Sequence, residues 1–221
     1  MLMLPLLGTG CDGPLSSLDP ASPQASAVAD LWWIMLVGSG LVFLLVMTLL
    51  TLAFTSARRY LRRPHAIYIL GGGLVFPATV LSVLLAYALF TGERLLADPA
   101  RPAALRVQAM AAQWQWTFRY ASGIEMSDRL VLPAGQPVDI AISSQDVIHS
   151  FWIPRLGGKI DALPGRIHVM RIISEQVGTY AGACAEFCGL NHAGMYFTVE
   201  VVPLAEFETV LRQAMDETRS N

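Results

Sequence analysis

Two long uncharged stretches dominate the hydrophobic pattern of the first half of the chain. Residues 31–55 and residues 66–91 contain no Asp, Glu, Lys or Arg. A helix needs about 20 predominantly apolar residues to cross a bilayer core, and both stretches exceed that length. Trp32 and Tyr87 lie near their ends, where interfacial aromatic side chains belong. The pattern predicts a two-helix transmembrane hairpin over residues 30–92.

A short basic loop separates the two spans. It contains Arg58, Arg59, Arg62 and Arg63. Short loops rich in Lys and Arg stay on the cytoplasmic side of the membrane. The rest of the chain is therefore expected on the other side, which for a bacterial cytoplasmic (inner) membrane is the periplasm.

From about residue 101, short alternating runs and turn residues replace the long apolar stretches. This pattern is typical of an all-β sandwich, which we place at residues 101–203. The predicted strands cover residues 105–110, 115–120, 138–143, 148–153, 167–173 and 196–202. A final segment, residues 204–221, is predicted to hold a short amphipathic helix, because apolar residues recur there at helical spacing: Leu204, Phe207, Val210, Leu211 and Met215. The expected fold class is membrane α plus all-β.

Composition supports the membrane assignment. Of the 221 residues, 54% are hydrophobic and only 14% are charged, with a formal net charge of −2. Such a bias is unusual for a soluble domain. We therefore expect a membrane protein and no nucleic-acid partner.

The N-terminus, residues 1–29, carries a second membrane signal. Residues 1–7 are apolar, Cys11 follows small residues, and a stretch rich in Ser, Pro and Ala continues to about residue 29. This arrangement resembles a bacterial lipoprotein signal, in which Cys11 would be lipidated after processing. It departs from that signal because no basic residue precedes the apolar run and Gly8 stands where an aliphatic residue is usual. The alternative is a thiol without a role.

One loop concentrates soft metal ligands. Cys184, Cys188, His192 and Met195 lie within twelve residues, and His149 lies upstream. Thiolate, thioether and imidazole ligands favour copper or zinc over magnesium or calcium. A mononuclear blue-copper site needs only one Cys, whereas two thiolates four residues apart can bridge two copper ions. Two alternatives stay open: a disulfide between the two cysteines, and a zinc site of two Cys and two His, which would leave Met195 without a purpose.

With these motifs the chain resembles subunit II of the haem–copper cytochrome c oxidases of bacteria. The resemblance rests on the ligand loop and on three further motifs at residues 113–116, 149–154 and 159–166. It implies two membrane helices followed by a cupredoxin-like domain that holds the binuclear copper centre called CuA. The implied ligands are Cys184 and Cys188 as bridges, His149 and His192 as caps, and Met195 with the backbone carbonyl of Glu186.

The resemblance also implies roles for residues around the copper. Trp114 matches the aromatic residue where an electron arrives from cytochrome c, although Trp114 or Trp116 could simply belong to the core. The Glu186 carboxylate would reach a Mg²⁺ ion at the border with subunit I, the alternative being an ordinary salt bridge. Asp161 and Arg166 would contact subunit I near the haem propionates. A basic cytochrome is the usual donor, and the 14 acidic against 11 basic residues from position 93 onward predict salt-sensitive docking.

One position departs from the family pattern. Many relatives have a Glu seven residues before the proline of the second membrane helix, at the mouth of a proton path, but counting back from Pro77 gives Leu70. His65 lies about one turn earlier and could substitute for that Glu, but beside a basic loop it is equally well explained as a residue that contacts lipid headgroups. The other histidine, His168, alternates with Ile167 and Val169 on a predicted strand, and we interpret it as structural.

The expected function is that of the electron-accepting subunit of a proton-translocating terminal oxidase. Cytochrome c would reduce the copper pair, which passes electrons to haem in subunit I for reduction of O₂ to water, with subunit III as a further partner. No complete active site is expected in this chain alone. The alternatives are a CuA-containing nitric oxide reductase subunit and a membrane-anchored copper carrier; a quinol oxidase subunit would lack the copper ligands.

Overall fold

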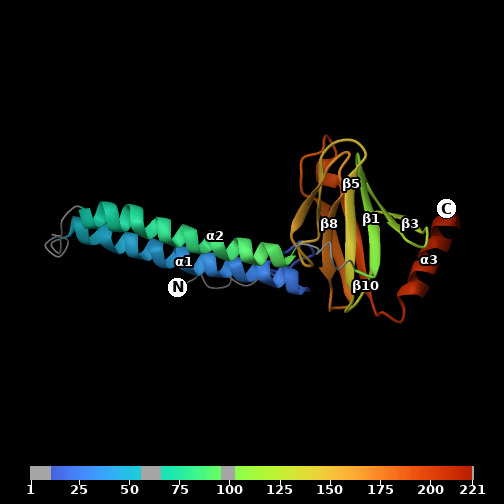
Figure 1. The fold of residues 1–221 in the computed structure, drawn as a ribbon, viewed down its shortest axis with the longest axis horizontal. Coiled ribbons are helices and arrows are strands. Elements are labelled where there is room, and N and C mark those ends of the chain that lie inside the picture. The colour runs from blue at the N-terminus through green and yellow to red at the C-terminus, as the bar shows by residue number, and fades with distance from the viewer. Residues whose placement is uncertain (1–10, 56–65, 96–102, 221) are drawn as a thin grey trace, which may run out of the picture. The chain divides into compact units, whose positions relative to one another are not determined.

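The computed structural model describes residues 11–55, 66–95 and 103–220, and divides into two compact units. One unit is Asp30–Arg94, and the other combines Met1–Ala29 with Leu95–Asn221 (Figure 1). The four loop arginines, His65 and the apolar residues 1–7 lie outside the described residues.

The first unit is a pair of long apolar helices. Helix α1 spans Pro23–Phe54, and the second rod consists of the π-helical segment η2 (Ile67–Val75) and α2 (Phe76–Leu95). Among the described residues, these two rods are long and apolar enough to cross a membrane. Their large apolar side chains are exposed, as lipid-facing side chains would be.

The start of the second rod differs from a regular α-helix. The N–H of Phe76 bonds to the carbonyl of Gly71, five residues back, instead of four. Three consecutive glycines precede this point, and Pro77, which has no N–H to donate, follows it directly. The sequence predicted the apolar span but not this change of helical winding.

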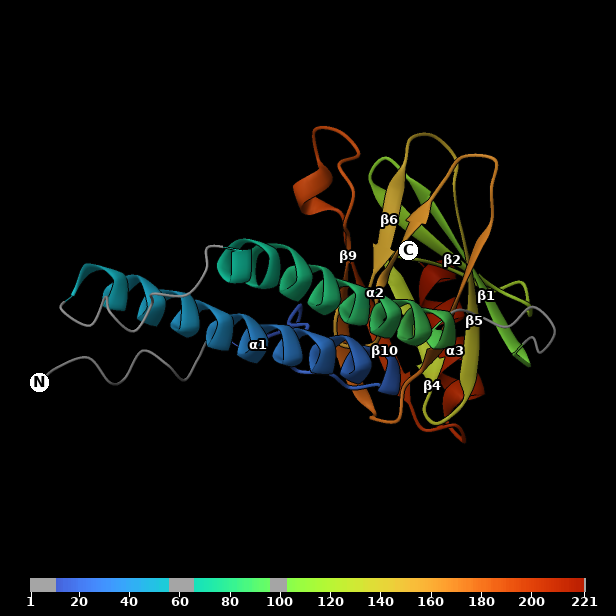
Figure 2. The same cartoon turned by 60° about the vertical axis from the view of Figure 1, so that its left-hand side comes forward.

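The second unit is built around a sandwich of two five-stranded sheets, seen in two views in Figures 1 and 2. One sheet has the order β3 (Glu125–Ser127), β2 (Gln115–Tyr120), β1 (Leu105–Ala112), β5 (Pro137–Ser144), β8 (His168–Ile173). The other has the order β4 (Arg129–Pro133), β10 (Tyr196–Val202), β9 (Gly178–Cys184), β6 (His149–Trp152), β7 (Lys159–Ala162). Helix α3 (Phe207–Ser220) lies against β3 and β4 (Figure 1).

Aromatic side chains from both sheets meet in the core. The Phe151 ring lies 5.0 Å from Phe197 and 5.4 Å from Trp116, centroid to centroid. Phe197 lies directly opposite Gly182 in the β9–β10 ladder, and a Cβ atom on Gly182 would come within 2.1 Å of the Phe197 ring. Only glycine leaves room for that ring, and the close fit fixes strand β9 against β10.

All six predicted strands are present, but four others were missed. Strands β3 and β7 have only three and four residues, and β4 is apolar without alternation. Strand β9 contains two Gly and two Ala, which have low strand propensity, and it forms because its neighbours pair with it on both sides. The C-terminal helix begins three residues later than predicted, since Leu204 precedes it and is 53% exposed.

The residues before the membrane pack on the sandwich. The Ala21 N–H bonds to the Arg155 carbonyl at 2.7 Å, and Ser22 Oγ donates to the Leu156 carbonyl at 2.7 Å. Arg155 also pairs with Asp19 at 2.8 Å. These contacts make residues 19–22 part of the β-domain.

Candidate metal centre

Two neighbouring strands bring the first ligands together. His149 begins β6, and Cys184 ends β9. These strands pair antiparallel with Phe151 opposite Cys184, so residues 35 positions apart meet at one end of the sheet. The loop of residues 185–195 then leaves β9 and returns to β10, and the Cys184 N–H bonds to the Met195 carbonyl at its base. Figure 2 shows this loop projecting from the end of the sandwich.

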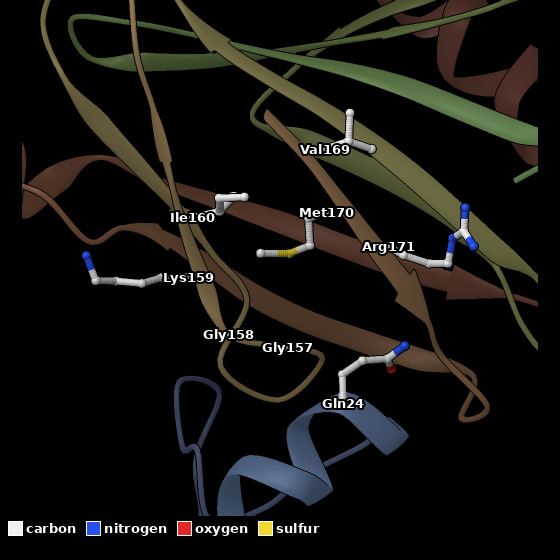
Figure 3. Close-up of a pocket in the computed structure, with 8 residues that line it drawn as sticks. All are labelled: Gln24, Gly157, Gly158, Lys159, Ile160, Val169, Met170 and Arg171. Atoms are coloured by element: carbon white, nitrogen blue, oxygen red, sulfur yellow. The ribbon is translucent and has the colours of Figure 1, made fainter. Parts of the chain in front are cut away.

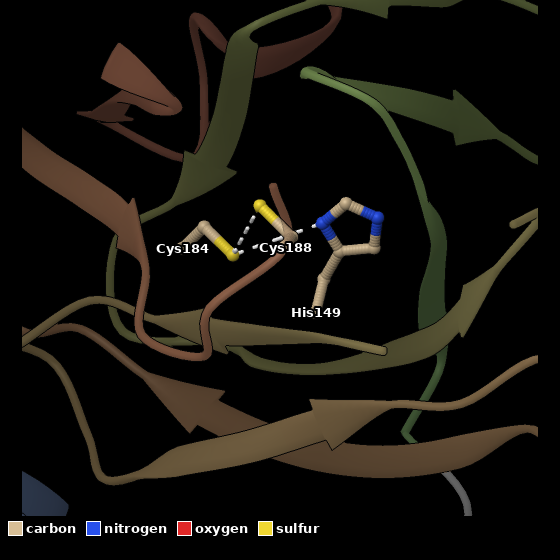
Figure 4. Close-up of side chains that lie close together, drawn as sticks. All are labelled: His149, Cys184 and Cys188. Carbon is tan, nitrogen blue, oxygen red and sulfur yellow. Dashed lines mark hydrogen bonds between the residues drawn. The ribbon is translucent and has the colours of Figure 1, made fainter. Parts of the chain in front are cut away.

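The ligand atoms of His149, Cys184 and Cys188 all lie within 4.8 Å of one another (Figure 4). The two Sγ atoms are 3.8 Å apart, and Cys184 Sγ lies 3.7 Å from His149 Nδ1. Two sulfurs bound at about 2.3 Å to one tetrahedral ion would lie about 3.8 Å apart. The observed spacing therefore fits a shared metal, whereas a disulfide requires about 2.05 Å.

A second set of donors lies around Cys188. His192 Nδ1 and Met195 Sδ are each 3.7 Å from Cys188 Sγ. On the other side, the Glu186 carbonyl oxygen is 3.2 Å from Cys184 Sγ. Each sulfur thus has one histidine nitrogen 3.7 Å away. This donor set suits two metal ions that share both sulfurs.

The protein surroundings make a free Cys188 thiolate unfavourable. Burial, together with the adjacent Cys184 and the charge of Asp146, raises the pKa of the Cys188 thiol to about 12. A metal ion would supply the positive charge that holds both sulfurs deprotonated. Metal binding is therefore expected to release protons.

Asp146 orients the buried side chain of His149, a predicted copper ligand. Its Oδ1 lies 2.8 Å from His149 Nε2, and it also accepts the backbone N–H groups of Gln113 and Val147, each at 2.7 Å. Burial alone would raise the pKa of Asp146, but these hydrogen bonds outweigh it and lower the pKa. With Nε2–H donated to this carboxylate, Nδ1 of His149 is the nitrogen left to bind metal.

The sequence interpretation did not identify Asp146. Its position three residues before His149 was the available signal. That signal is weak, because only the turn between β5 and β6 folds the carboxylate back onto the imidazole.

Trp114 touches the ligand loop from the β1–β2 turn. Its Nε1–H donates to the Cys188 carbonyl at 3.2 Å, and Gln113 Nε2 donates to the same oxygen at 2.8 Å. Gly189 has φ +117°, and a Cβ there would lie 2.9 Å from Gln113 Nε2 and 3.3 Å from the Trp114 ring. Trp114 is half-buried, whereas Trp116 is fully buried in the core. One of the two tryptophans is thus a core residue, as the alternative interpretation allowed.

The carboxylates predicted to face subunit I lie around a lysine. Lys159 Nζ is 3.5 Å from Asp161 Oδ1 and 3.7 Å from Glu186 Oε2. The Asp161 carbonyl accepts a hydrogen bond from His168 Nδ1 at 2.7 Å, which gives His168 a structural contact, and Arg166 is exposed in the turn between β7 and β8.

Two further residues were singled out in the sequence. Cys11 is exposed, and Leu70 is exposed on the apolar helices. A cavity of about 150 Å³ opens near Gln24, Lys159 and Met170 (Figure 3), but none of the predicted copper ligands lines it.

Comparison with known proteins finds similarity to one family. The sequence model described as "Cytochrome C oxidase subunit II, periplasmic domain" matches residues 121–202. Cytochrome c oxidase subunit 2 of Alkalihalophilus pseudofirmus is 31% identical over 93% of this chain and 64% of that protein. Subunit 2 of Lycodon semicarinatus is 33% identical over 47% of this chain and 55% of that protein. The chain thus spans less than two thirds of the length of these relatives.

A solved structure agrees with the sequence matches. The periplasmic domain of subunit II of cytochrome oxidase of Bradyrhizobium japonicum aligns with a TM-score of 0.50 and 28% identity, covering 53% of this chain and 97% of that domain. The predicted fold class is confirmed: two apolar helices, a cupredoxin-like β-sandwich and a C-terminal helix. The two apolar helices and the matched domain fit a membrane protein with a periplasmic domain. The chain is thus similar to subunit II of the cytochrome c oxidases, and its β-domain to the periplasmic domain of that subunit.

Proposed function

We propose that this chain is the electron-accepting subunit of a terminal oxidase, reduced by cytochrome c and delivering electrons to haem in subunit I. The observation that carries the proposal is the double contact at Cys188. Its sulfur belongs to the ligand cluster, and its carbonyl accepts the indole N–H of the half-exposed Trp114. A single residue thus joins the protein surface to the metal site.

In this proposal Cys184, Cys188, His149, His192, Met195 and the Glu186 carbonyl would hold two copper ions. When bound, that copper pair would supply one-electron redox chemistry. The protein supplies rigidity, because the ligands come from paired strands and from a loop hydrogen-bonded at its base. Asp146 keeps the His149 ring in one orientation, and rigid ligands move little when charge changes.

The remaining partners follow from the same proposal. Asp161 and Arg166 contact subunit I, with subunit III completing the complex, while O₂ reduction to water and proton translocation take place outside this chain. Glu186 extends its carboxylate from the ligand loop and would bind Mg²⁺ at that border in place of its contact with Lys159. Leu70 offers no proton-carrying group to the complex.

The proposed location is the bacterial cytoplasmic membrane, with the copper domain in the periplasm. Cys11 is the proposed lipidation site. It is exposed, and residues 19–22 already hold the following segment on the β-domain, so a lipid on Cys11 would tether that domain near the membrane surface.

Two other functions use the same ligands. A nitric oxide reductase subunit would contain an equivalent copper pair and differ in its partner subunit. A copper carrier needs ligands that exchange readily, whereas His149, Cys184, Cys188 and Met195 are all at most 6% exposed. Burial therefore favours electron transfer over metal transfer.

The test is the copper stoichiometry and electron paramagnetic resonance spectrum of the full-length chain in detergent. The full chain is required because residues 19–22 pack on the β-domain. Two coppers sharing one delocalised unpaired electron would support the proposal. One copper, zinc in preference to copper, or a Cys184–Cys188 disulfide that resists loading would refute it.

A further inference from the structure

The surface around the copper ligands has an apolar centre. Leu190, at the tip of the ligand loop, is 98% exposed, and Phe187 in the same loop is 76% exposed. Leu190 follows Gly189, which packs against the Trp114 ring. Val147, next to Asp146, is also exposed. Leu190 and Phe187 are far more exposed than an apolar side chain of a β-domain usually is.

Charge is scarce on the same surface. Three segments surround the ligands, residues 113–114, 145–148 and 185–195, and they contain no Lys or Arg and only two acids, Asp146 and Glu186. Both acids already have partners. Asp146 accepts hydrogen bonds from His149 and two backbone N–H groups, and Glu186 lies 3.7 Å from Lys159 Nζ.

From this surface we infer that the electron donor docks here by apolar contact and carries little net charge around its haem edge. The inference rests on the proposed function and names the chemistry of its partner. The donor is a one-electron haem protein whose exposed haem edge is ringed by apolar side chains, which cover Leu190 and the Trp114 indole. One electron would leave the donor's ferrous iron, which becomes ferric, and the copper pair held by Cys184, Cys188, His149 and His192 would accept it.

The charge pattern separates this docking mode from electrostatic steering. A lysine-ringed donor gains association rate only where the acceptor presents several unpaired acids. Here the docking segments hold only Asp146 and Glu186, and both carboxylates already have partners, so a high positive charge on the donor would add little to the association rate. The inference thus differs from the salt-sensitive docking expected from the charge count of residues 93–221, because it predicts docking that salt affects weakly.

Equilibrium binding to the metal-free full-length chain tests the inference without electron transfer. Two oxidised c-type cytochromes serve as probes, one strongly basic and one near neutral, each titrated from about 10 mM to 500 mM salt, a range over which the Debye length shrinks from about 30 Å to well under 10 Å. The test variant is Leu190→Ser. The matched control is Val177→Ser, an equally simple change at an exposed apolar residue at the far end of β9.

The inference predicts that the near-neutral cytochrome binds at least as tightly as the basic one and that salt changes its affinity less than threefold. Leu190→Ser should weaken binding about tenfold, the loss expected when one leucine no longer leaves water on docking. Val177→Ser should leave binding unchanged. A fall of tenfold or more with salt, tighter binding of the basic cytochrome, no effect of Leu190→Ser, or no binding at all would overturn the inference.

A separate readout distinguishes this result from failure of the proposed function. The copper-loaded chain is mixed with each ferrous cytochrome, and haem oxidation is followed by absorbance. Salt-sensitive electron transfer would leave the proposed function standing while removing the apolar docking mode. A copper centre that accepts electrons from dithionite but from neither cytochrome would count against the function itself.

Discussion

Replacing Asp146 by asparagine should weaken copper binding by disturbing one histidine. In the structure a single carboxylate oxygen accepts the Nε2–H of His149 at 2.8 Å, while the other accepts the Gln113 N–H. An amide retains only one acceptor oxygen and presents an NH₂ group to one of these donors. Either His149 loses its hydrogen-bond partner and its ring orientation, or the Gln113 backbone N–H loses its acceptor.

The expected loss of copper affinity follows from the hydrogen bond that the variant lacks. A bond to a charged group contributes about 1.5–3 kcal/mol. That range corresponds to a factor of roughly 10 to 150 in affinity at about 1.4 kcal/mol per tenfold. Loss of such partners of metal-binding histidines lowers metal affinity by about 10- to 100-fold, which agrees with this range.

The test is the copper affinity of the Asp146→Asn variant relative to wild type. It is measured on the full-length chain in detergent at pH 7, by competition with a chromophoric chelator. Asp128→Asn is the matched control, because Asp128 also accepts a backbone N–H, that of Trp116 at 2.8 Å, and does so without touching a ligand. Asparagine also tolerates the φ of +52° at that position. Equal copper affinities for the two variants would refute the idea that Asp146 orients His149.

Three further outcomes are expected. Gly182→Ala should destabilise the β-domain by about 1–3 kcal/mol or more, because the new methyl group overlaps the buried Phe197 ring; a thermal midpoint equal to wild type in a circular dichroism melt would contradict this. Burial opposes ionisation of Asp139, but the ion pair with Arg171 and the hydrogen bond from the Ala103 N–H outweigh it and lower the pKa of Asp139. The Asp139–Arg171 pair therefore stabilises the fold above the unfolded-state pKa of about 3.9. This stabilisation disappears as the pH falls through the lower folded-state pKa. Asp139→Asn should therefore cost about 3 kcal/mol at pH 7 and progressively less below pH 4, and a constant difference between thermal midpoints across that range would exclude the explanation. Trp114→Phe keeps an aromatic ring but removes the N–H donated to Cys188, so it should slow reduction by cytochrome while leaving the paramagnetic resonance spectrum unchanged; an unchanged rate would remove Trp114 from the electron path.

Local sequence patterns were enough to predict the features that depend on residues close together in the chain. An uninterrupted apolar run of more than 20 residues has few folded alternatives outside a membrane, so the hairpin was readable from residues 31–55 and 66–91. Runs of alternating polar and apolar residues predicted six strands, because successive side chains of a strand point to opposite faces and one face of each strand is buried. The candidate metal-binding side chains from Cys184 to Met195 could be proposed from the sequence because they lie in one short segment.

Pairing between distant strands decided the rest. Strand β9, with its glycines and alanines, has little tendency of its own to be extended, and it becomes a strand because β10 and β6 pair with it and the Phe197 ring occupies the space above Gly182. That pairing in turn places His149 beside Cys184.

The contacts of the metal site with its surroundings also needed the tertiary structure. Asp146 reaches His149 only through the turn before β6, and Trp114 reaches Cys188 only through the turn between β1 and β2. The order of residues along the chain therefore determined which chemical groups are available and which segments enter the membrane. Only the folded sheet decided which groups touch, because hydrogen bonds and packing act over a few ångströms in space whatever the separation in sequence.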